Sequence, residues 1–275
     1  MKKIIFCDID GTLIKGLSKI SYHNLLAFKK FMDAGGKVVL STGRSSSSIR
    51  GVIAQIEKFT KHKLEYVICS TGGYIYDFLG ATTITHPISN FNSRKIYEYC
   101  RKKRIWFWGY NEEANRRFAV FASNIWFGSI TRMFKNIRTL MVKKTTDLTC
   151  FKIITLSLSK KKINILSSWI KQEFNSQINV THQNPMMLEL NAVGVSKGKA
   201  IKYILNQLNI EPGDAVAIGN GVNDIEAFNA VGLSFAVNTR NKTVFSQANH
   251  HYSYYRDAVY DAINEHILDL ETKNH

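Results

Sequence analysis

An apolar run, Ile4–Cys7, leads directly into the acidic segment Asp8–Thr12, which reads DIDGT. A short continuous apolar run of this kind favours a strand that is buried on both faces of a parallel sheet. Gly11 then allows the chain to turn sharply at the end of that strand. The sequence therefore predicts two carboxylates, Asp8 and Asp10, at the carboxyl edge of an early strand, where open α/β sheets bind ligands.

The two carboxylates are close enough in sequence to need a neutralising partner. A spacing of two would place Asp8 and Asp10 on one face of an ideal strand, but the bend at Gly11 leaves their directions open. Neighbouring carboxylates repel each other unless a cation or a proton intervenes. A hard dication suits this need, and Mg²⁺ binds one or two carboxylates together with substrate oxygens. The alternative is a strand followed by an acidic turn without function.

The Asp8–Thr12 segment resembles the first motif of the haloacid dehalogenase superfamily of phosphatases and phosphomutases. The resemblance implies that Asp8 is a nucleophile that takes the phosphoryl group and that Asp10 is the general acid/base. It also implies that Mg²⁺ bridges Asp8 and the phosphate, with Asp10 in the metal site as well.

A second strand end carries hydroxyl and glycine residues. The pattern predicts a helix over Tyr22–Ala34, capped by Ser21, and then a strand over Lys37–Leu40. Ser41–Arg44 follows this strand and leads into a serine-rich helix start at Ser45–Ser48. A hydroxyl, a glycine and a helix N-terminus together form an anion site, because free backbone N–H groups point outward.

The Thr42-Gly43-Arg44 sequence resembles the second motif of the Cof-type branch of the superfamily. There the Thr42 hydroxyl and the Gly43 N–H would hold a phosphate oxygen. For Arg44, a local ion pair and a direct contact with substrate are both open.

Lys197 lies at the N-terminus of a predicted helix, where a positive charge is unfavourable. Ser196 is a predicted N-cap for a helix that runs through Leu208, and Lys197 follows it immediately. The helix macrodipole favours anions at that end, so a phosphate would compensate the lysine charge. The alternative is a solvated surface lysine. The Ser-Lys-Gly sequence resembles the third family motif, in which Lys197 would neutralise the phosphoryl oxygens and Asp8.

The segment Gly219–Asp224, which reads GNGVND, follows a predicted strand over Ala215–Ile218. It resembles the fourth family motif, Gly-Asp-Gly-x-Asn-Asp, with Asn220 in place of the first aspartate. The amide oxygen of Asn220 can bind Mg²⁺ but brings no charge. By the resemblance, Asn223 reaches the phosphate, and Asp224 binds the metal or orients its ligands. The alternative is a glycine-rich turn in which Asn223 caps a helix.

The middle of the chain interrupts the alternation of strands and helices. Strands are predicted at Trp106–Tyr110, Phe118–Phe121 and Phe151–Leu158, and a helix is predicted at Lys160–Phe174. Met187–Asn191 is interpreted as the return to the core. We therefore predict a Rossmann-like α/β core over residues 1–83 and 188–275, with an inserted α+β domain over residues 84–187. The family resemblance implies that the insert is a cap that selects the substrate.

Composition and charge argue against a membrane-spanning, secreted or nucleic-acid-binding protein. No window approaches the eighteen uncharged apolar residues of a membrane span, and the N-terminal apolar run is too short for a signal peptide. The four cysteines show neither metal-ligand spacing nor a disulfide framework, which favours the reducing cytoplasm. The net charge of +16 favours anionic ligands. The basic residues are mostly scattered, with runs at Arg101–Arg104 and Lys160–Lys162, so nucleic acid is not expected as a partner. Because no segment is long and apolar enough to span a bilayer, a membrane is not expected as a partner either.

The resemblance of all four motifs, in order, to those of the haloacid dehalogenase superfamily implies a cytoplasmic, Mg²⁺-dependent phosphatase that hydrolyses small phosphorylated metabolites, with sugar phosphates expected by family analogy alone. Its intermediate would be a phosphorylated Asp8. A phosphomutase is the nearest enzymatic alternative. A binding protein that has lost turnover and senses a phosphorylated ligand is the other, and Asn220 is the feature that favours it.

Overall fold

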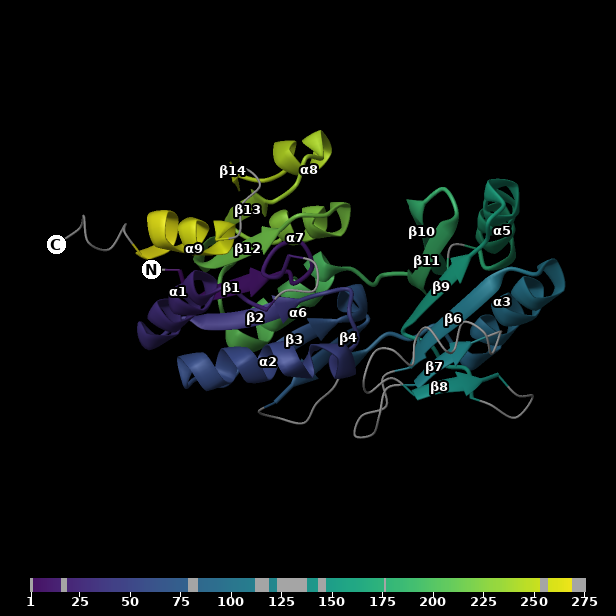
Figure 1. Ribbon diagram of the computed structural model, residues 1–275, viewed down its shortest axis with the longest axis horizontal. Coiled ribbons are helices and arrows are strands. Elements are labelled where there is room, and N and C mark those ends of the chain that lie inside the picture. Colours follow the sequence, from purple (N-terminus) through teal and green to yellow (C-terminus); the bar gives the residue numbers. More distant parts are fainter. Residues whose placement is uncertain are drawn as a thin grey trace. The chain divides into compact units, whose positions relative to one another are not determined.

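The structure is a computed structural model, and the residues that it describes are 2–15, 19–78, 84–111, 119–122, 138–142, 147–175, 177–252 and 257–268 (Figure 1). The chain forms two compact units. The first comprises residues 1–44, 49–82 and 196–275, and the second comprises residues 45–48 and 83–195. The α/β class with a parallel-sheet core is confirmed, and the inserted segment has a separate, mainly antiparallel sheet.

The first unit is built on a sheet of strand order β14-β13-β12-β1-β2-β3-β4-β5, in which β3 and β4 are antiparallel. The strands of this sheet are β1 (Ile4–Cys7), β2 (Lys37–Ser41), β3 (Tyr66–Cys69), β4 (Tyr74–Asp77), β5 (Ile84–Thr85), β12 (Ala215–Gly219), β13 (Leu233–Val237) and β14 (His250–Tyr252), and all of them except β5 belong to the first unit. Its α-helices are α1 (Tyr22–Asp33), α2 (Ser46–Thr60), α6 (Lys197–Leu208), α7 (Ile225–Phe228), α8 (Lys242–Ser246) and α9 (Ala258–Ile263). Shorter helical turns are η1 (Ser70–Gly72), η2 (Pro212–Asp214), η3 (Val222–Asp224) and η4 (Asn264–Leu268).

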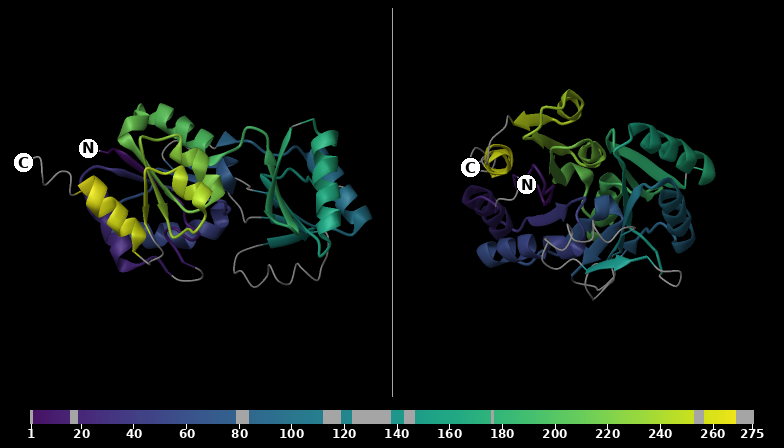
Figure 2. Two further views of the ribbon diagram at one scale, coloured as in Figure 1. Left: turned by 90° about the horizontal axis from the view of Figure 1, so that it is seen from above. Right: turned by 45° about the vertical axis from the view of Figure 1, so that its right-hand side comes forward.

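Strand β1 lies at the centre of this sheet, as its apolar sequence predicts. All four of its residues are buried, and it pairs in parallel with β2 on one side and β12 on the other. Helix α1 packs against α9, and α6 packs against α7. Figure 2 shows α1 and α9 on one face of the sheet and α6 on the other. Helices cover both faces of the sheet, so side chains on both faces of its strands are buried. This explains why the strand sequences are apolar without alternation.

Local capping signals set the helix starts. The Ser21 hydroxyl accepts a hydrogen bond from the backbone N–H of Asn24, and the Ser196 hydroxyl accepts one from that of Lys199. Each bond satisfies a backbone donor that the first helical turn leaves unpaired. Both predicted N-caps are therefore confirmed.

The second unit is a sheet of strand order β10-β11-β9-β6-β7-β8 with helices α3 and α5 packed on it. Its elements are α3 (Asn90–Lys103), β6 (Trp106–Asn111), β7 (Ala119–Ala122), β8 (Arg138–Met141), β9 (Lys152–Leu156), α5 (Lys160–Glu173), β10 (Ile178–Asn184) and β11 (Met187–Ala192). Alternation along β6 buries Phe107 in the apolar core of this unit, while Trp106 and Trp108 are half-buried.

One expectation about this unit is wrong. Met187–Asn191 does not return to the parallel core, because it lies in β11, which pairs antiparallel with β9 and β10. The chain rejoins the first unit only at Ser196. A strand buried in an antiparallel sheet and one buried in a parallel sheet have similar apolar sequences, so the sequence did not separate them. Phe118, the predicted start of one strand, lies outside the described residues, and β7 begins at Ala119.

Among the helices within the described ranges, none is both long enough and apolar enough to cross a membrane.

Candidate active site

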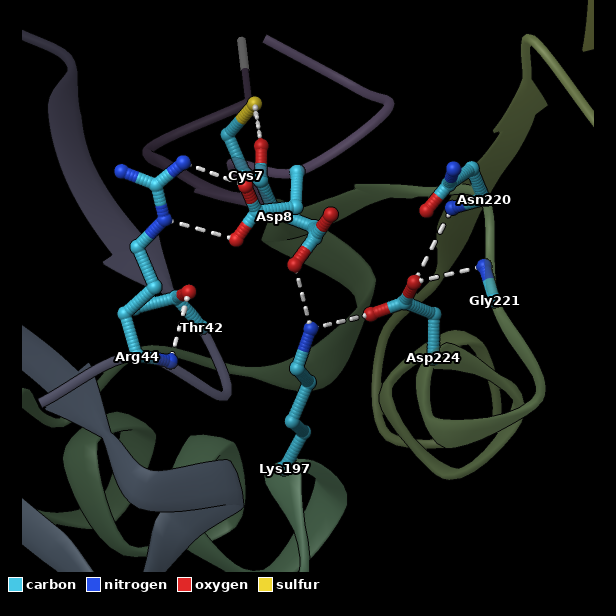
Figure 3. Close-up of polar contacts among 9 residues, drawn as sticks. Cys7, Asp8, Thr42, Arg44, Lys197, Asn220, Gly221 and Asp224 are labelled. Atoms are coloured by element: carbon cyan, nitrogen blue, oxygen red, sulfur yellow. Dashed lines mark hydrogen bonds and ion pairs between the residues drawn. The ribbon is translucent and has the colours of Figure 1, made fainter. Parts of the chain in front are cut away.

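The ends of three adjacent parallel strands bring the predicted site residues together. Asp8 follows β1, Thr42 follows β2, and the Gly219–Asp224 segment begins at the end of β12. Because β1 lies between β2 and β12, all three segments meet at one edge of the sheet. This edge is the candidate active site (Figure 3).

Lys197 lies between two carboxylates in the interior. Its Nζ donates hydrogen bonds of 2.6 Å to Oδ1 of Asp8 and of 2.6 Å to Oδ1 of Asp224. Lys197 has no exposed surface, and Asp8 and Asp224 are 6% and 2% exposed. A lysine is almost never buried so completely without partners of opposite charge. The two ion pairs explain why this one is, and they exclude the alternative of a solvated surface lysine.

The start of α6 places Lys197 there. Lys197 is the first residue of the helix, after the Ser196 cap. A side chain at the next position, Gly198, would overlap the backbone carbonyl of Glu226, so only glycine lets the helix start pack directly against α7. Because the start of α6 lies so close to α7, the Lys197 ammonium reaches the residues at the ends of β1 and β12.

Burial and charge oppose each other at this site. Burial raises the pKa of Asp8 to about 6; the Lys197 charge opposes the rise and the Asp224 charge adds to it. Burial alone would lower the pKa of Lys197, but the charges of Asp224 and Asp8 raise it above its ordinary value. Lys197 is therefore a permanent cation, and it holds Asp8 near the point where the ionised, nucleophilic form predominates at neutral pH.

Asp224 connects this lysine to the neighbouring loop. Its Oδ2 accepts hydrogen bonds of 2.9 Å from the backbone N–H groups of both Asn220 and Gly221, while its Oδ1 accepts from Lys197. Both carboxylate oxygens are thus engaged with the protein. Of the two roles that the sequence left open for Asp224, this geometry favours orienting the loop over direct contact with a metal.

Asn220 lies against the Asp8–Thr12 loop. Gly11 has a φ of +81°, and a Cβ on it would overlap the side-chain amide of Asn220. A side chain at position 11 would therefore be strained twice, by its backbone conformation and by this contact. In Figure 3 the Asn220 amide points to the side of the site on which Asp8 lies.

Asp10 and Arg44 form a forked ion pair. Nε of Arg44 donates to Oδ2 of Asp10 at 2.8 Å, and Nη2 donates to Oδ1. This hydrogen bonding also raises the pKa of Arg44. The backbone N–H of Arg44 donates to the Thr42 hydroxyl at 3.1 Å. Arg44 therefore pairs locally in this structure, which is one of the two roles that the sequence left open.

The other predicted phosphate contacts differ in exposure. Thr42 is fully buried, Gly43 is half-buried, and Asn223 is exposed on η3. The sequence did not reveal the pairing of Asp10 with Arg44 or the double use of Asp224. The only signal for the first was the presence of opposite charges after neighbouring strands, which is common on any surface.

The oxygen donors near Asp8 suit a hard dication. Asp8 offers a carboxylate and Asn220 an amide oxygen, and Mg²⁺ completes its coordination with waters and substrate oxygens. The Asp10 carboxylate is already bound by Arg44. The Asp224 carboxylate is already bound by Lys197 and by the backbone N–H groups of the loop. Among the residues that the structure describes, no cluster of three or more His, Cys, Asp or Glu side chains is arranged to hold a metal. The donor set therefore fits a magnesium ion that is shared with substrate rather than caged by protein.

The chain is similar to known proteins over most of its length. A family model of haloacid dehalogenase-like hydrolases matches residues 5–263. A putative phosphatase of Streptococcus pyogenes is 25% identical, with 81% of this chain and 82% of that protein covered. A 5-amino-6-(5-phospho-D-ribitylamino)uracil phosphatase of Bacillus subtilis is 23% identical, with 86% and 83% covered. A chloroplastic endoribonuclease of Arabidopsis thaliana is 26% identical over 85% of this chain, which spans only 41% of that protein.

Solved structures share the fold. A haloacid dehalogenase-like hydrolase from Bacteroides thetaiotaomicron superposes with a TM-score of 0.82 at 20% identity and covers 96% of this chain and 99% of its own. A sugar phosphatase of HAD subclass IIB superposes with a TM-score of 0.74 at 18% identity, with 99% and 98% covered.

Proposed function

The chain belongs to the haloacid dehalogenase-like hydrolases, a phosphatase family, and on that premise we propose that it hydrolyses phosphate monoesters of small metabolites with Asp8 as nucleophile. The observation that carries the proposal is the buried Asp8–Lys197–Asp224 triad at the carboxyl edge of the sheet. Asp8 supplies an ionisable carboxylate, and Lys197 supplies a fixed cation beside it. Asp224 holds Lys197 in place through its own hydrogen bond.

In the proposed first step, an Asp8 oxygen forms a bond to phosphorus while the bond from phosphorus to the ester oxygen breaks. The leaving oxygen takes a proton from Asp10. In the second step, Asp10 as carboxylate takes a proton from water, and the resulting hydroxide displaces phosphate from Asp8. The ion pair with Arg44 suits the ionised Asp10 that acts as the base in the second step. To donate a proton in the first step, Asp10 has to be protonated and to leave this ion pair.

The remaining residues stabilise charge on the transferring group. Lys197, the Thr42 hydroxyl, the Gly43 N–H and Asn223 would contact the equatorial oxygens, and such electrostatic stabilisation is the main catalytic term in phosphoryl transfer. Asp8 and Asn220 would hold Mg²⁺, which when bound neutralises charge on the phosphoryl oxygens. Asp224 acts as a positioning residue, since its carboxylate fixes Lys197 and the loop that carries Asn220.

We propose a phosphorylated sugar, polyol or related metabolite as the substrate class, with the inserted domain as the cap that selects it. The names of two similar proteins, a sugar phosphatase and a phosphatase of a ribitylamino-uracil phosphate, support this class. Phosphate release from a panel of phosphorylated sugars, polyols, nucleotides and amino acids, with Mg²⁺ present, tests it. Turnover confined to nucleotides or phosphoamino acids would contradict the substrate class but not the phosphatase activity.

Asn220 favours a second candidate, a protein that binds phosphorylated ligands without turnover. An amide in place of a carboxylate leaves the candidate metal site one negative charge short. Release of phosphate from p-nitrophenyl phosphate with Mg²⁺ separates the two candidates. Ligand binding without any phosphate release would support the binding protein.

We expect Asp10→Asn to lower turnover of a phosphate ester with a poor leaving group by about 10²–10⁴-fold, because an amide neither donates nor accepts the required proton. With p-nitrophenyl phosphate, whose leaving group needs no proton, the first step should persist and give a burst of nitrophenolate. Asp33→Asn is the matched control, since Asp33 is also paired on the surface, with Lys29 and His62. A loss below tenfold with the poor leaving group would refute the acid/base role.

We expect Asn220→Asp to lower the Mg²⁺ concentration for half-maximal turnover, by roughly tenfold if the new carboxylate adds about 1.4 kcal/mol of binding free energy. Calorimetric titration of Mg²⁺ should show the same shift without substrate. Asn206→Asp, on the exposed side of α6, adds the same charge away from the site and should leave both values unchanged. An unchanged half-saturation point for Asn220→Asp would exclude Asn220 from the metal site.

A further inference from the structure

Two basic runs that are far apart in sequence meet at one end of the second unit. Helix α3 ends with Arg101, Lys102 and Lys103 and is capped by Arg104, and α5 begins with Lys160–Lys162. Nζ of Lys162 donates a hydrogen bond of 2.9 Å to the backbone carbonyl of Lys103, across 59 positions of sequence. All seven side chains are exposed. We call these seven residues the basic patch.

The sheet explains why the two runs meet. Helix α3 leads into β6, which begins at Trp106, and β9 ends at Leu156 just before α5. Trp106 and Leu156 are directly paired in the antiparallel sheet. The end of α3 and the start of α5 therefore lie over the same edge, so the patch is fixed by the fold and not by the conformation of a loop.

Exposed apolar side chains lie at this same edge. Leu158, between β9 and α5, is 79% exposed, and Met186, in the turn between β10 and β11, is 37% exposed. The backbone N–H of Ser157 donates to the carbonyl of Met186 at 3.0 Å, which joins the two segments. The edge thus combines seven cations with two exposed apolar side chains.

Within the part of the chain that the structure describes, the cations of the patch lack the acidic partners that many other basic residues have. Lys3, Lys29 and Lys95 each form a salt bridge with an Asp or Glu, whereas no patch residue does so with the residues described here. Glu98 is the acidic residue of α3 and lies one turn before Lys102, but the two side chains do not form a salt bridge in the described structure. Three lysines in the first turn of α5 also oppose its macrodipole, so helix stability does not explain their placement.

We propose that the basic patch, with Leu158 and Met186, is a docking surface for an anionic lipid bilayer. Clusters of four to eight Lys and Arg residues bind anionic headgroups, and adjacent apolar side chains enter the boundary between headgroups and acyl chains. A nucleic acid would be attracted by the same charges, but it offers no apolar layer for Leu158 and Met186. The sequence predicts no membrane partner because no segment spans a bilayer, and a surface contact needs no such segment.

Vesicle flotation of the full chain tests the proposal. Vesicles of phosphatidylcholine with 30% phosphatidylglycerol are compared with pure phosphatidylcholine, in about 0.1 M and 0.5 M NaCl, where the screening length falls from about 10 Å to under 5 Å. We expect the protein to float with the anionic vesicles in low salt only. The triple variant Lys102→Gln, Lys160→Gln, Lys161→Gln should reduce the partition coefficient at least tenfold, and Leu158→Ser should reduce it severalfold.

A matched triple variant removes the same charge elsewhere. Lys58, Lys202 and Lys242 are exposed on helices of the first unit, and their change to Gln should alter the partition coefficient less than twofold. Circular dichroism and p-nitrophenyl phosphate turnover monitor the fold of each variant. Equal losses in both triple variants, or no flotation of the wild type, would overturn the proposal. So would tighter binding of a 30-nucleotide RNA through the same lysines in the same salt.

Discussion

Asp8→Asn should abolish phosphate release, by roughly 10⁴-fold or more, because the neutral amide cannot attack phosphorus. The fold should persist. The change removes one negative charge from a triad of two carboxylates and one ammonium, and it leaves Lys197 paired with Asp224. Burial already disfavours the ionised form of Asp8, so its loss removes an electrostatic cost. Initial rates with p-nitrophenyl phosphate and thermal melting together test both expectations.

Two companion variants strengthen this test. Asp8→Ala guards against slow deamidation of the asparagine, which would restore wild-type enzyme. Asp8→Glu keeps the carboxylate but moves it by one methylene, and a displacement of about 1 Å is enough to cost 10²-fold in a positioned reaction. Turnover of Asp8→Asn within tenfold of wild type, in protein with a normal melting curve, would show that another group attacks phosphorus.

Lys197→Met should reduce turnover by at least about 10²-fold and should also destabilise the protein. It removes the cation that would face the phosphoryl oxygens, a change comparable to losing a donor of an oxyanion hole. It also leaves Asp8 and Asp224 buried together without a counter-charge. Removing one partner of a buried ion pair costs about 3–5 kcal/mol of unfolding free energy. Kinetics and denaturant unfolding measure the two effects separately.

The pH dependence of this destabilisation has a definite sign. The pKa of Asp8 in the folded protein lies above its ordinary value, and loss of Lys197 raises it further. A raised carboxyl pKa costs stability at high pH, and this cost disappears as the pH falls through the folded-state pKa. Lys197→Met should therefore lose more stability at pH 8 than at pH 5. The double variant Lys197→Met, Asp8→Asn should regain much of the stability at pH 8 but none of the activity.

An equal loss of stability at both pH values, with no recovery in the double variant, would mean that Lys197 matters for packing and not for charge. Lys197→Arg adds a further check, because it keeps the charge in a larger group that the space between Asp8 and Asp224 was not built to hold.

The sequence predicted those parts of the site that depend on local pattern. The apolar run before Asp8, the glycine after it and the serine before Lys197 each specify a strand end or a helix start, and the structure has these elements. What it could not predict is how a side chain divides its hydrogen bonds among partners. Asp224 was expected near the metal, but its oxygens contact Lys197 and two backbone N–H groups. Such choices depend on distances of tenths of an ångström.

The same limit applies to the fold. The strand at Met187–Asn191 was recognised, but its sheet was not, because alternation and apolar content do not tell a strand which neighbour it pairs with. The opposite case is Trp106 and Phe107. There the alternation of side chains along a strand is enough to place the two on different faces of the sheet, and Phe107 is buried in the core of the second unit.

The pairing of Asp8 with Lys197 joins positions that are 189 residues apart. On a ribosome the chain emerges from its N-terminus, so Asp8 leaves the exit tunnel long before either residue that surrounds it. Strand β1 likewise waits for β12 to cover one of its sides. Until the segment up to Asp224 has been made, the nascent first unit has an incomplete sheet, and contacts of such long sequence separation form slowly. The inserted unit, whose paired strands all lie between residues 106 and 192, can complete its own sheet first. Synthesis therefore completes the sheet of the second unit before that of the first, and premature termination anywhere before Asp224 leaves the candidate active site without the partner that Asp224 provides for Lys197.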